Sequence, residues 1–304
     1  MSSIQILQSK TNPYKEKYDK LIKLNCSPSS RKKNKKQHTC LSDETLHKLR
    51  EMWNQRHPDV PIHTKNAEDI WNTLKRYMSN ICNKESCWLK QDFTKGQMKD
   101  IIKRDFAPKS PDEWKKNPNE WLSSVDITDV MKQYEDTYPY FSFIGPSPID
   151  FDTRKMNGNC VWNEICNLSL KKEINEGITK IGIIFNLDPH YKSGSHWVSL
   201  FINIPKRFIF YFDSAGEKVP KEIMKLSENI MKQGKELTPR PIQFSFDENH
   251  PKEHQFGDTE CGMYSLYFII NMLEDKINGN ILKKSRIKDK EMEEFRKIYF
   301  NQDL

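Results

Sequence analysis

Apolar residues recur at helical spacing in the first third of the chain. One stripe follows Ser42, a suitable N-cap, and ends before Pro58. Its apolar members are Leu46, Leu49 and Trp53. A second stripe opens after Asn66, and its apolar members are Ile70, Trp71, Leu74 and Met78. Together with a shorter stripe over about 95–104, these patterns predict a small unit that is mainly α-helical.

From residue 107 onward, apolar runs of strand length alternate with helical stripes. The strand-like runs cover 181–187, 198–202, 207–212 and 242–246. The helical stripes cover 126–136, 219–237, the segment that begins at Cys261, and 291–299. Ser110-Pro-Asp-Glu predicts one more helix start. Residues 141–151 are apolar but rich in proline, and no element is assigned to them. A small central sheet flanked by helices makes an α+β fold.

A proline-broken stretch, Phe106-Ala-Pro-Lys-Ser-Pro111, separates these two regions and predicts a domain boundary. We expect a mainly helical N-terminal domain over 1–106, with a flexible start through the basic stretch Ser27–Lys36, and a second domain over 107–304. The first part holds 22 Lys and Arg against 12 Asp and Glu, a net charge of +10, and the second holds 27 against 30, a net charge of −3. The basic domain can contact DNA or an acidic protein surface, although a basic surface that meets only solvent explains the same charge.

The composition limits where the protein acts. No apolar run reaches the 18 residues typical of a membrane-spanning helix, and no secretory signal is evident, so we expect neither a membrane partner nor secretion. Seven cysteines in 304 residues fit a reducing compartment better than a disulfide scaffold. Cys82-x4-Cys87, with His38 and Cys40 upstream, poorly matches the spacing of structural zinc sites, so buried thiols are the better prediction. The sequence predicts no metal and no cofactor.

Cys261 is the strongest candidate for a nucleophile. A polar loop precedes it and an apolar helical stripe follows. Unpaired backbone N–H groups and the helix dipole favour an anion at a helix N-terminus, so a cysteine there tends toward the reactive thiolate. On this segment alone, a small apolar residue that starts a core helix is the slightly better interpretation.

His196 and Asp213 supply the two further groups that a cysteine nucleophile needs. His196 leads into the strand 198–202, and Asp213 follows the strand 207–212. The turn Ile204-Pro-Lys between the strands predicts a hairpin, which brings both residues to one edge of the sheet. There His196 can act as a base, and Asp213 can orient its imidazole ring.

Other residues of the same types compete for these roles. Cys160 and Cys166 are rival nucleophiles, but neither begins so clear a helix. The rival bases are His190, His250 and His254. Of these, His254 is the best because it is close to Cys261 in the sequence.

The order His, Asp, Cys resembles the superfamily of ubiquitin-like-protein proteases and adenovirus proteases. The residues that carry the resemblance are His196-Trp197, Asp213, and the motif Gln255-x5-Cys261-Gly. Over about 107–304 the chain is most similar to the polyprotein-processing proteases of large DNA viruses, with further likeness in Pro146-Ser-Pro-Ile-Asp-Phe-Asp and Thr259-Glu-Cys-Gly-x-Tyr-Ser. The resemblance implies a papain-like cysteine protease core of the ubiquitin-like-protein protease type.

The resemblance also implies roles for single residues. It implies a triad of His196, Asp213 and Cys261, with Gln255 as the side-chain donor of the oxyanion hole. It implies that Trp197 covers a narrow tunnel that admits only glycines. An ordinary loop glutamine and a tryptophan of the sheet core stay open as alternatives for Gln255 and Trp197.

The function implied by the resemblance is a cysteine endopeptidase that cleaves after Gly-Gly-type sites. Its substrates would be viral structural polyprotein or capsid precursors, cut during virion maturation in the host cytoplasm, at the viral factory, and in the virion. Two alternatives stay open: a protease that removes a ubiquitin-like modifier, and a nucleic-acid-binding virion protein with a protease-like domain.

Overall fold

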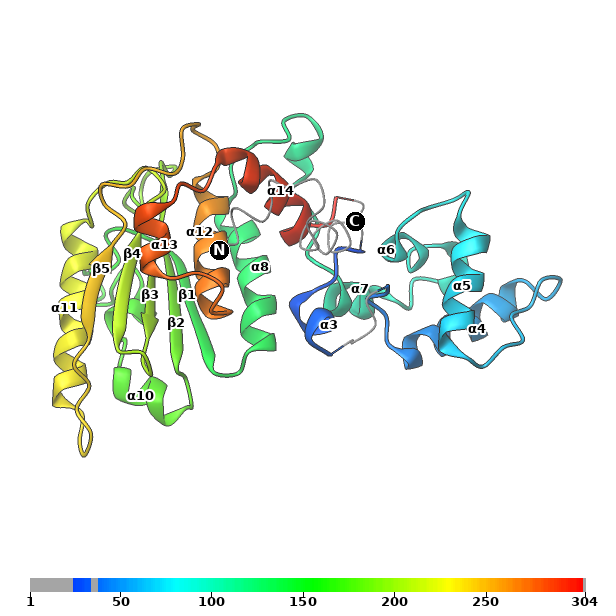
Figure 1. The fold of residues 1–304 in the computed structure, drawn as a ribbon, viewed down its shortest axis with the longest axis horizontal. Helices are drawn as coiled ribbons and strands as arrows, with labels where there is room; N and C mark the ends of the chain where they lie inside the picture. The colour runs from blue at the N-terminus through cyan, green and yellow to red at the C-terminus, as the bar shows by residue number, and fades with distance from the viewer. Residues whose placement is uncertain (1–23, 34–37, 303–304) are drawn as a thin grey trace. The chain divides into compact units, whose positions relative to one another are not determined.

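The computed structural model describes residues 24–33 and 38–302, which divide into two units (Figure 1). One unit is Pro111–Arg296, and the other joins residues 24–33, 38–110 and 297–302. The predicted domains 1–106 and 107–304 stay a prediction. Most of the predicted flexible start lies outside the described residues, but Pro28–Lys33 within it forms the helix α3, so the expectation is wrong for this part.

The described residues of the first unit contain a five-stranded sheet with the strand order β1-β2-β3-β4-β5. The strands are β1 (Phe141–Pro148), β2 (Lys180–Asn186), β3 (Trp197–Asn203), β4 (Phe208–Phe212) and β5 (Ser245–Glu248). β2, β3 and β4 pair in antiparallel fashion, and the β3–β4 pair is the hairpin predicted from the sequence. β1 and β5 pair in parallel at the two edges. The mixed sheet with its helices confirms the α+β prediction.

Helices surround this sheet. They are α8 (Ser124–Thr137), α9 (Asn163–Cys166), α10 (Leu170–Asn175), α11 (Lys221–Glu236), α12 (Cys261–Leu273), α13 (Gly279–Lys284) and α14 (Asp289–Tyr299). α8, α11, α12 and α14 confirm the four predicted helical stripes. The helix start predicted at Ser110 is wrong, because a short 3-10 turn, η2 (Asp112–Lys115), forms there with Pro111 at the N-cap position.

Side chains alternate across the central strands, so each face of the sheet is covered by a different helix. Leu200 of β3 shares a core cluster with Ile223 of α11. On the opposite face, the ring of Phe212 stacks on Phe268 of α12 with centroids 4.9 Å apart. Figure 1 shows α11 and α12 on opposite sides of the strands. A Cβ atom on Gly182 of β2 would lie 2.8 Å from the Ile269 side chain, so glycine lets α12 approach the sheet closely.

The second unit is helical, as predicted. Besides α3 it contains α4 (Asp43–Arg56), α5 (Ala67–Met78), α6 (Glu85–Trp88), the 3-10 turn η1 (Asp92–Thr94) and α7 (Lys99–Asp105). Ser42 caps α4 by accepting the Thr45 N–H, and Asn66 caps α5 in the same way. The apolar stripes of both helices are buried in one core cluster.

Three disulfides correct the prediction of free buried thiols. They join Cys26 to Cys40, Cys82 to Cys87, and Cys160 to Cys166. No group of three or more His, Cys, Asp or Glu residues in the described part of the chain could hold a metal ion. The pairing depends on Cα–Cα distances of 5.2 to 6.3 Å that only the fold sets. Among the described residues, no helix is both long and apolar enough to span a membrane.

Candidate active site

His196 and Asp213 meet at one edge of the sheet. β3 begins immediately after His196, and β4 ends immediately before Asp213. Because the two strands are antiparallel neighbours, the start of one lies beside the end of the other. The Nε2 atom of His196 and the Oδ1 atom of Asp213 are 2.7 Å apart. The pairing expected from the hairpin is therefore present.

Asp213 is buried and held in one orientation. Its side chain is 1% exposed. The backbone N–H of Ala215 donates to the same Oδ1 atom at 2.8 Å. The side-chain amide of Asn249, which the sequence did not single out, bonds both the N–H and the C=O of the Asp213 backbone. A carboxylate fixed in this way can orient the His196 ring and stabilise its protonated form.

Cys261 is the first residue of α12 and is 1% exposed, with a free thiol. The thiol interacts with the His196 ring. Burial by itself lowers the pKa of His196, but hydrogen bonds and electrostatic interactions with Asp213 and Cys261 raise this pKa to about 10. The imidazole is therefore positively charged near neutral pH.

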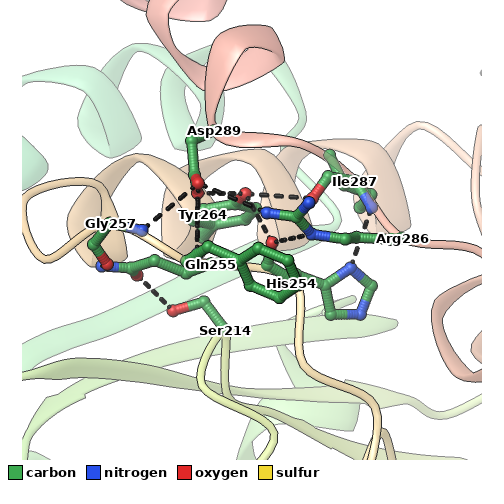
Figure 2. Close-up of polar contacts among 9 residues, drawn as sticks. Ser214, His254, Gln255, Gly257, Tyr264, Arg286, Ile287 and Asp289 are labelled. Carbon is green, nitrogen blue, oxygen red and sulfur yellow. Dashed lines mark hydrogen bonds and ion pairs between the residues drawn. The ribbon is translucent and has the colours of Figure 1, made fainter.

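Gln255 lies in the loop that precedes α12 and is 7% exposed. The Ser214 hydroxyl donates to Oε1 of Gln255 at 2.8 Å, and Nε2 of Gln255 donates to the Gly257 carbonyl at 2.7 Å (Figure 2). A side-chain amide carries two N–H donors, so a second N–H is left over. Gln255 and Cys261 share no hydrogen bond in the described chain. Ser214, which directly follows Asp213, therefore links the acid of the site to this loop.

Trp197 lines a hollow of about 610 Å³. Its indole is 8% exposed and donates to the Leu122 carbonyl at 3.0 Å. Gly262 lies close to the indole, since an added Cβ atom on Gly262 would lie 3.3 Å from the Trp197 ring. Trp121, which the sequence reasoning did not single out, is 40% exposed and lines the same hollow. Trp162 lines it as well, so three tryptophans border the hollow, and one of them, Trp197, directly follows His196.

A buried histidine, His254, is the rival base nearest to Cys261 in the sequence. It is fully buried. Its Nδ1 accepts the N–H of Ile287 at 3.1 Å, and its Nε2 donates to the Leu282 carbonyl at 3.0 Å. Burial lowers the pKa of His254 to about 4. Both ring nitrogens are therefore used within the fold, and the ring is neutral near pH 7.

The remaining rivals are also bonded elsewhere. Cys160 and Cys166 are joined to each other. Nδ1 of His190 lies 2.7 Å from the Asp150 carboxylate, and Nδ1 of His250 lies 2.7 Å from the Gly216 carbonyl. Among the described candidates, His196 and Cys261 therefore form the histidine–cysteine pair whose side chains interact.

A buried ion pair holds the residue that precedes Cys261. Arg296 of α14 makes two bonds to Glu260, Nε to Oε2 at 2.9 Å and Nη2 to Oε1 at 3.0 Å. The two side chains are only 3% and 4% exposed. Arg296 also donates to the Glu120 carbonyl at 2.8 Å. The pair fixes the N-terminus of α12, and its members are 36 residues apart, so no local pattern reveals it.

The chain is similar to known viral proteins. The chain is 34% identical over 232 residues to a protein of Acanthamoeba polyphaga mimivirus that is named as a thiol protease, and the match covers 75% of this chain and 72% of that protein. It is also 23% identical over 253 residues to the SUMO-1 cysteine protease of an African swine fever virus isolate. That match covers 80% of this chain and 91% of the viral protein.

A solved structure shares the fold. The crystal structure of a protease of African swine fever virus matches 91% of this chain and 95% of its own chain, with a TM-score of 0.64 and 22% identity. Residues 126–303 match the Ulp1 protease family, C-terminal catalytic domain. This segment contains the sheet, the His196–Asp213 pair and Cys261. The chain therefore belongs to the Ulp1 family of cysteine proteases.

Proposed function

We propose that the chain is a cysteine endopeptidase with Cys261 as nucleophile, His196 as general base and acid, and Asp213 as the group that orients His196. One observation carries the proposal. The free thiol of Cys261 interacts with His196, while Nε2 of that ring lies 2.7 Å from a carboxylate that is almost fully buried. A nucleophile, a base and an orienting acid in this relation are the parts of a catalytic triad.

The reaction follows from these three groups. The sulfur of Cys261, its proton held by His196, attacks the carbonyl carbon of the scissile peptide bond. The C–N bond then breaks as His196 gives the proton to the leaving amine, and a thioester joins the acyl group to Cys261. Water, deprotonated by His196, attacks the thioester, and the acid product leaves as the sulfur departs. Asp213 orients the His196 ring throughout and stabilises the imidazolium.

Gln255 is proposed as the side-chain donor of the oxyanion hole, together with the backbone N–H of Cys261. Negative charge develops on the carbonyl oxygen during attack, and fixed N–H donors stabilise it. The Ser214 hydroxyl and the Gly257 carbonyl hold the Gln255 amide on both ends, so it needs little reorganisation. Removing one such donor typically raises the barrier by about 3 kcal/mol.

The substrate class we propose is a chain with two glycines before the scissile bond. Trp197, which directly follows His196, borders the hollow. Its indole is bonded to the Leu122 carbonyl and lies close to Gly262, so it cannot easily move to admit a Cβ atom. Viral structural polyprotein or capsid precursors are the proposed natural substrates, since the relatives named above are viral cysteine proteases. One relative is named as a SUMO-1 protease, which supports removal of a ubiquitin-like modifier as the second candidate function.

The decisive assay uses fluorogenic peptides with Gly-Gly, Ala-Gly or Gly-Ala before the scissile bond, under reducing conditions. We expect wild-type enzyme to prefer Gly-Gly and Cys261→Ala to be inactive. Cleavage by Cys261→Ala would refute the proposed nucleophile, and equal rates on the three peptides would refute the specificity. An intact modifier conjugate and a linear precursor containing Gly-Gly, compared at equal concentration, distinguish the two candidate functions.

We also propose that the basic unit contacts DNA, a role motivated by the excess of Lys and Arg in residues 1–106. Such binding weakens steeply with salt because phosphate contacts release counterions. A mobility-shift titration of the full chain, showing no shift even at low salt, would remove this idea. For the site of action we propose the cytoplasmic viral factory and the virion, which mass spectrometry of purified virions can test.

A further inference from the structure

The loop that carries Gln255 is held by one carboxylate. Asp289, the first residue of α14, accepts the backbone N–H of Phe256 at 3.1 Å and that of Gly257 at 3.3 Å (Figure 2). These are the two residues that follow Gln255. The Gly257 carbonyl in turn accepts the Gln255 amide at 2.7 Å. Asp289 therefore constrains the Gln255 side chain through a single residue, Gly257.

Two further side chains fix Asp289 itself. The Tyr264 hydroxyl donates to Oδ1 of Asp289 at 2.9 Å, and the Arg286 guanidinium lies 3.4 Å from Oδ2. Nε of Arg286 also donates to the His254 carbonyl at 2.8 Å, immediately before Gln255. Its guanidinium lies over the Phe256 ring, 3.2 Å from the ring centroid. Figure 2 shows these groups gathered around the loop: Tyr264 comes from α12, Asp289 from α14, and Arg286 from the segment just before α14.

The other side of the loop is held by Ser214, which directly follows Asp213 beyond the end of β4. The backbone N–H groups of His254 and Gln255 both donate to the Ser214 carbonyl, at 2.8 and 2.9 Å. The Ser214 hydroxyl donates to Oε1 of Gln255. Ser214 thus fixes the loop relative to Asp213, and Asp289 fixes its far end. Of these two anchors, Ser214 lies just beyond β4 and Asp289 begins α14.

We infer that Asp289 is a positioning residue that holds the Gln255 amide in the orientation required for transition-state stabilisation. The inference rests on the proposed role of Gln255 in the oxyanion hole. In this role Asp289 does not contact the substrate. It fixes Gly257, and Gly257 fixes the amide that donates to the developing oxyanion. An N–H donor that is free to turn must be reoriented during the reaction, which forfeits the advantage of preorganisation.

The test compares Asp289→Asn with Asp247→Asn, a matched control whose carboxylate pairs with Lys283 instead of the loop. For Asp289→Asn we expect kcat on a Gly-Gly peptide to fall about tenfold or more, with KM changed by less than about twofold, because the lost interaction acts in the transition state. The Ki of a peptide aldehyde, whose adduct with Cys261 is tetrahedral, should rise by a similar factor. The rate at which iodoacetamide alkylates Cys261 should stay at the wild-type value, since alkylation needs no oxyanion hole.

Equal kcat in wild type and Asp289→Asn would overturn the inference, and so would a parallel loss of alkylation, which would point to the Cys261–His196 pair or to the fold. If Asp289→Asn is unstable, Tyr264→Phe gives a milder variant, because it removes only one donor to Asp289. This variant should also lower kcat without changing KM, but by a smaller factor.

The double variant Gln255→Ala/Asp289→Asn separates the two proposals. If Asp289 acts through Gln255, the double variant is no slower than Gln255→Ala alone, whereas multiplied effects contradict it. A fully active Gln255→Ala would refute the oxyanion role itself.

Discussion

The Nε2 atom of His196 lies 2.7 Å from Oδ1 of Asp213, although 17 residues separate them in the chain. Because a carboxylate accepts hydrogen bonds, Nε2 carries the proton of this contact. The other ring nitrogen, Nδ1, is then left for the thiol of Cys261. One hydrogen bond thus selects the tautomer that the proposed mechanism needs.

Replacing Asp213 should separate orientation from charge. Asp213→Ala removes both, and we expect kcat to fall by about 10²- to 10⁴-fold, in the range seen for lost triad acids. Asp213→Asn keeps an oxygen that can accept the His196 N–H but loses the negative charge, so its kcat should lie between that of wild type and Asp213→Ala. Steady-state kinetics on a Gly-Gly peptide measure this order. An Asp213→Asn enzyme as slow as Asp213→Ala would show that the charge, and not the orientation, is decisive.

The pH profile should extend far into the alkaline range. His196 has a pKa raised from 6.5 to about 10, so the imidazolium that protonates the leaving amine persists until the pH passes about 10. The stabilisation gained from the charged ring is likewise complete below pH 6.5 and is lost as pH rises through 10. Initial rates between pH 6 and 11 show the alkaline limb. Asp213→Asn removes a negative charge, so its limb should move to lower pH; an unchanged limb would contradict the assignment to His196.

Acid should destabilise the fold through His254. Its pKa is lowered to about 4 by burial, whereas in the unfolded chain it is near 6.5. The unfolded state therefore binds the additional proton between these values, and stability falls as pH drops from 6.5 to 4, by about 3 kcal/mol over the window. Urea unfolding at fixed pH values measures the loss. His254→Gln should flatten this part of the profile even if it lowers stability overall, and an equally steep profile would refute the assignment.

Breaking the Glu260–Arg296 pair should cost stability as well as activity. Removing one partner of a buried pair leaves the other charge unpaired, which typically costs about 3–5 kcal/mol. We expect this for Arg296→Met, together with slower alkylation of Cys261, because Glu260 precedes the nucleophile. Lys225→Met breaks an exposed pair with Asp152 and serves as the control. Similar unfolding midpoints for the two variants would show that the buried pair contributes little.

Thiol labelling should distinguish Cys261 from the other cysteines. All seven lie in the described residues, and six of them are paired. Iodoacetamide added to the denatured, unreduced protein should label Cys261 alone, and reduction should expose the remaining six. Intact-mass measurement counts the labels. Seven labels before reduction would show that all seven cysteines are free thiols, as predicted from the sequence.

Several features could be predicted from the sequence because each depends on neighbouring residues. Ser42 and Asn66 cap their helices through residues two or three positions away, and the stripe after Cys261 follows from helical periodicity. The His196–Asp213 contact also needed only a short hairpin, whose two strands must lie side by side. The family resemblance added the proposed roles of Gln255 and Trp197, which no spacing rule supplies.

The tertiary structure decided the contacts between segments that are distant in the chain. β1 pairs with β2 across more than thirty intervening residues, as its partners Phe141 and Lys180 show, and its proline-rich pattern predicted no strand. The disulfides, the Glu260–Arg296 pair and the Asp289 contacts to the Gln255 loop likewise join groups whose distance no local pattern encodes. Periodicity reports which face of an element is buried, but it does not report which residue lies opposite. The sequence therefore determined the elements and the chemical types of the site, and the packing of α12 and α14 on the sheet determined what holds that site in place.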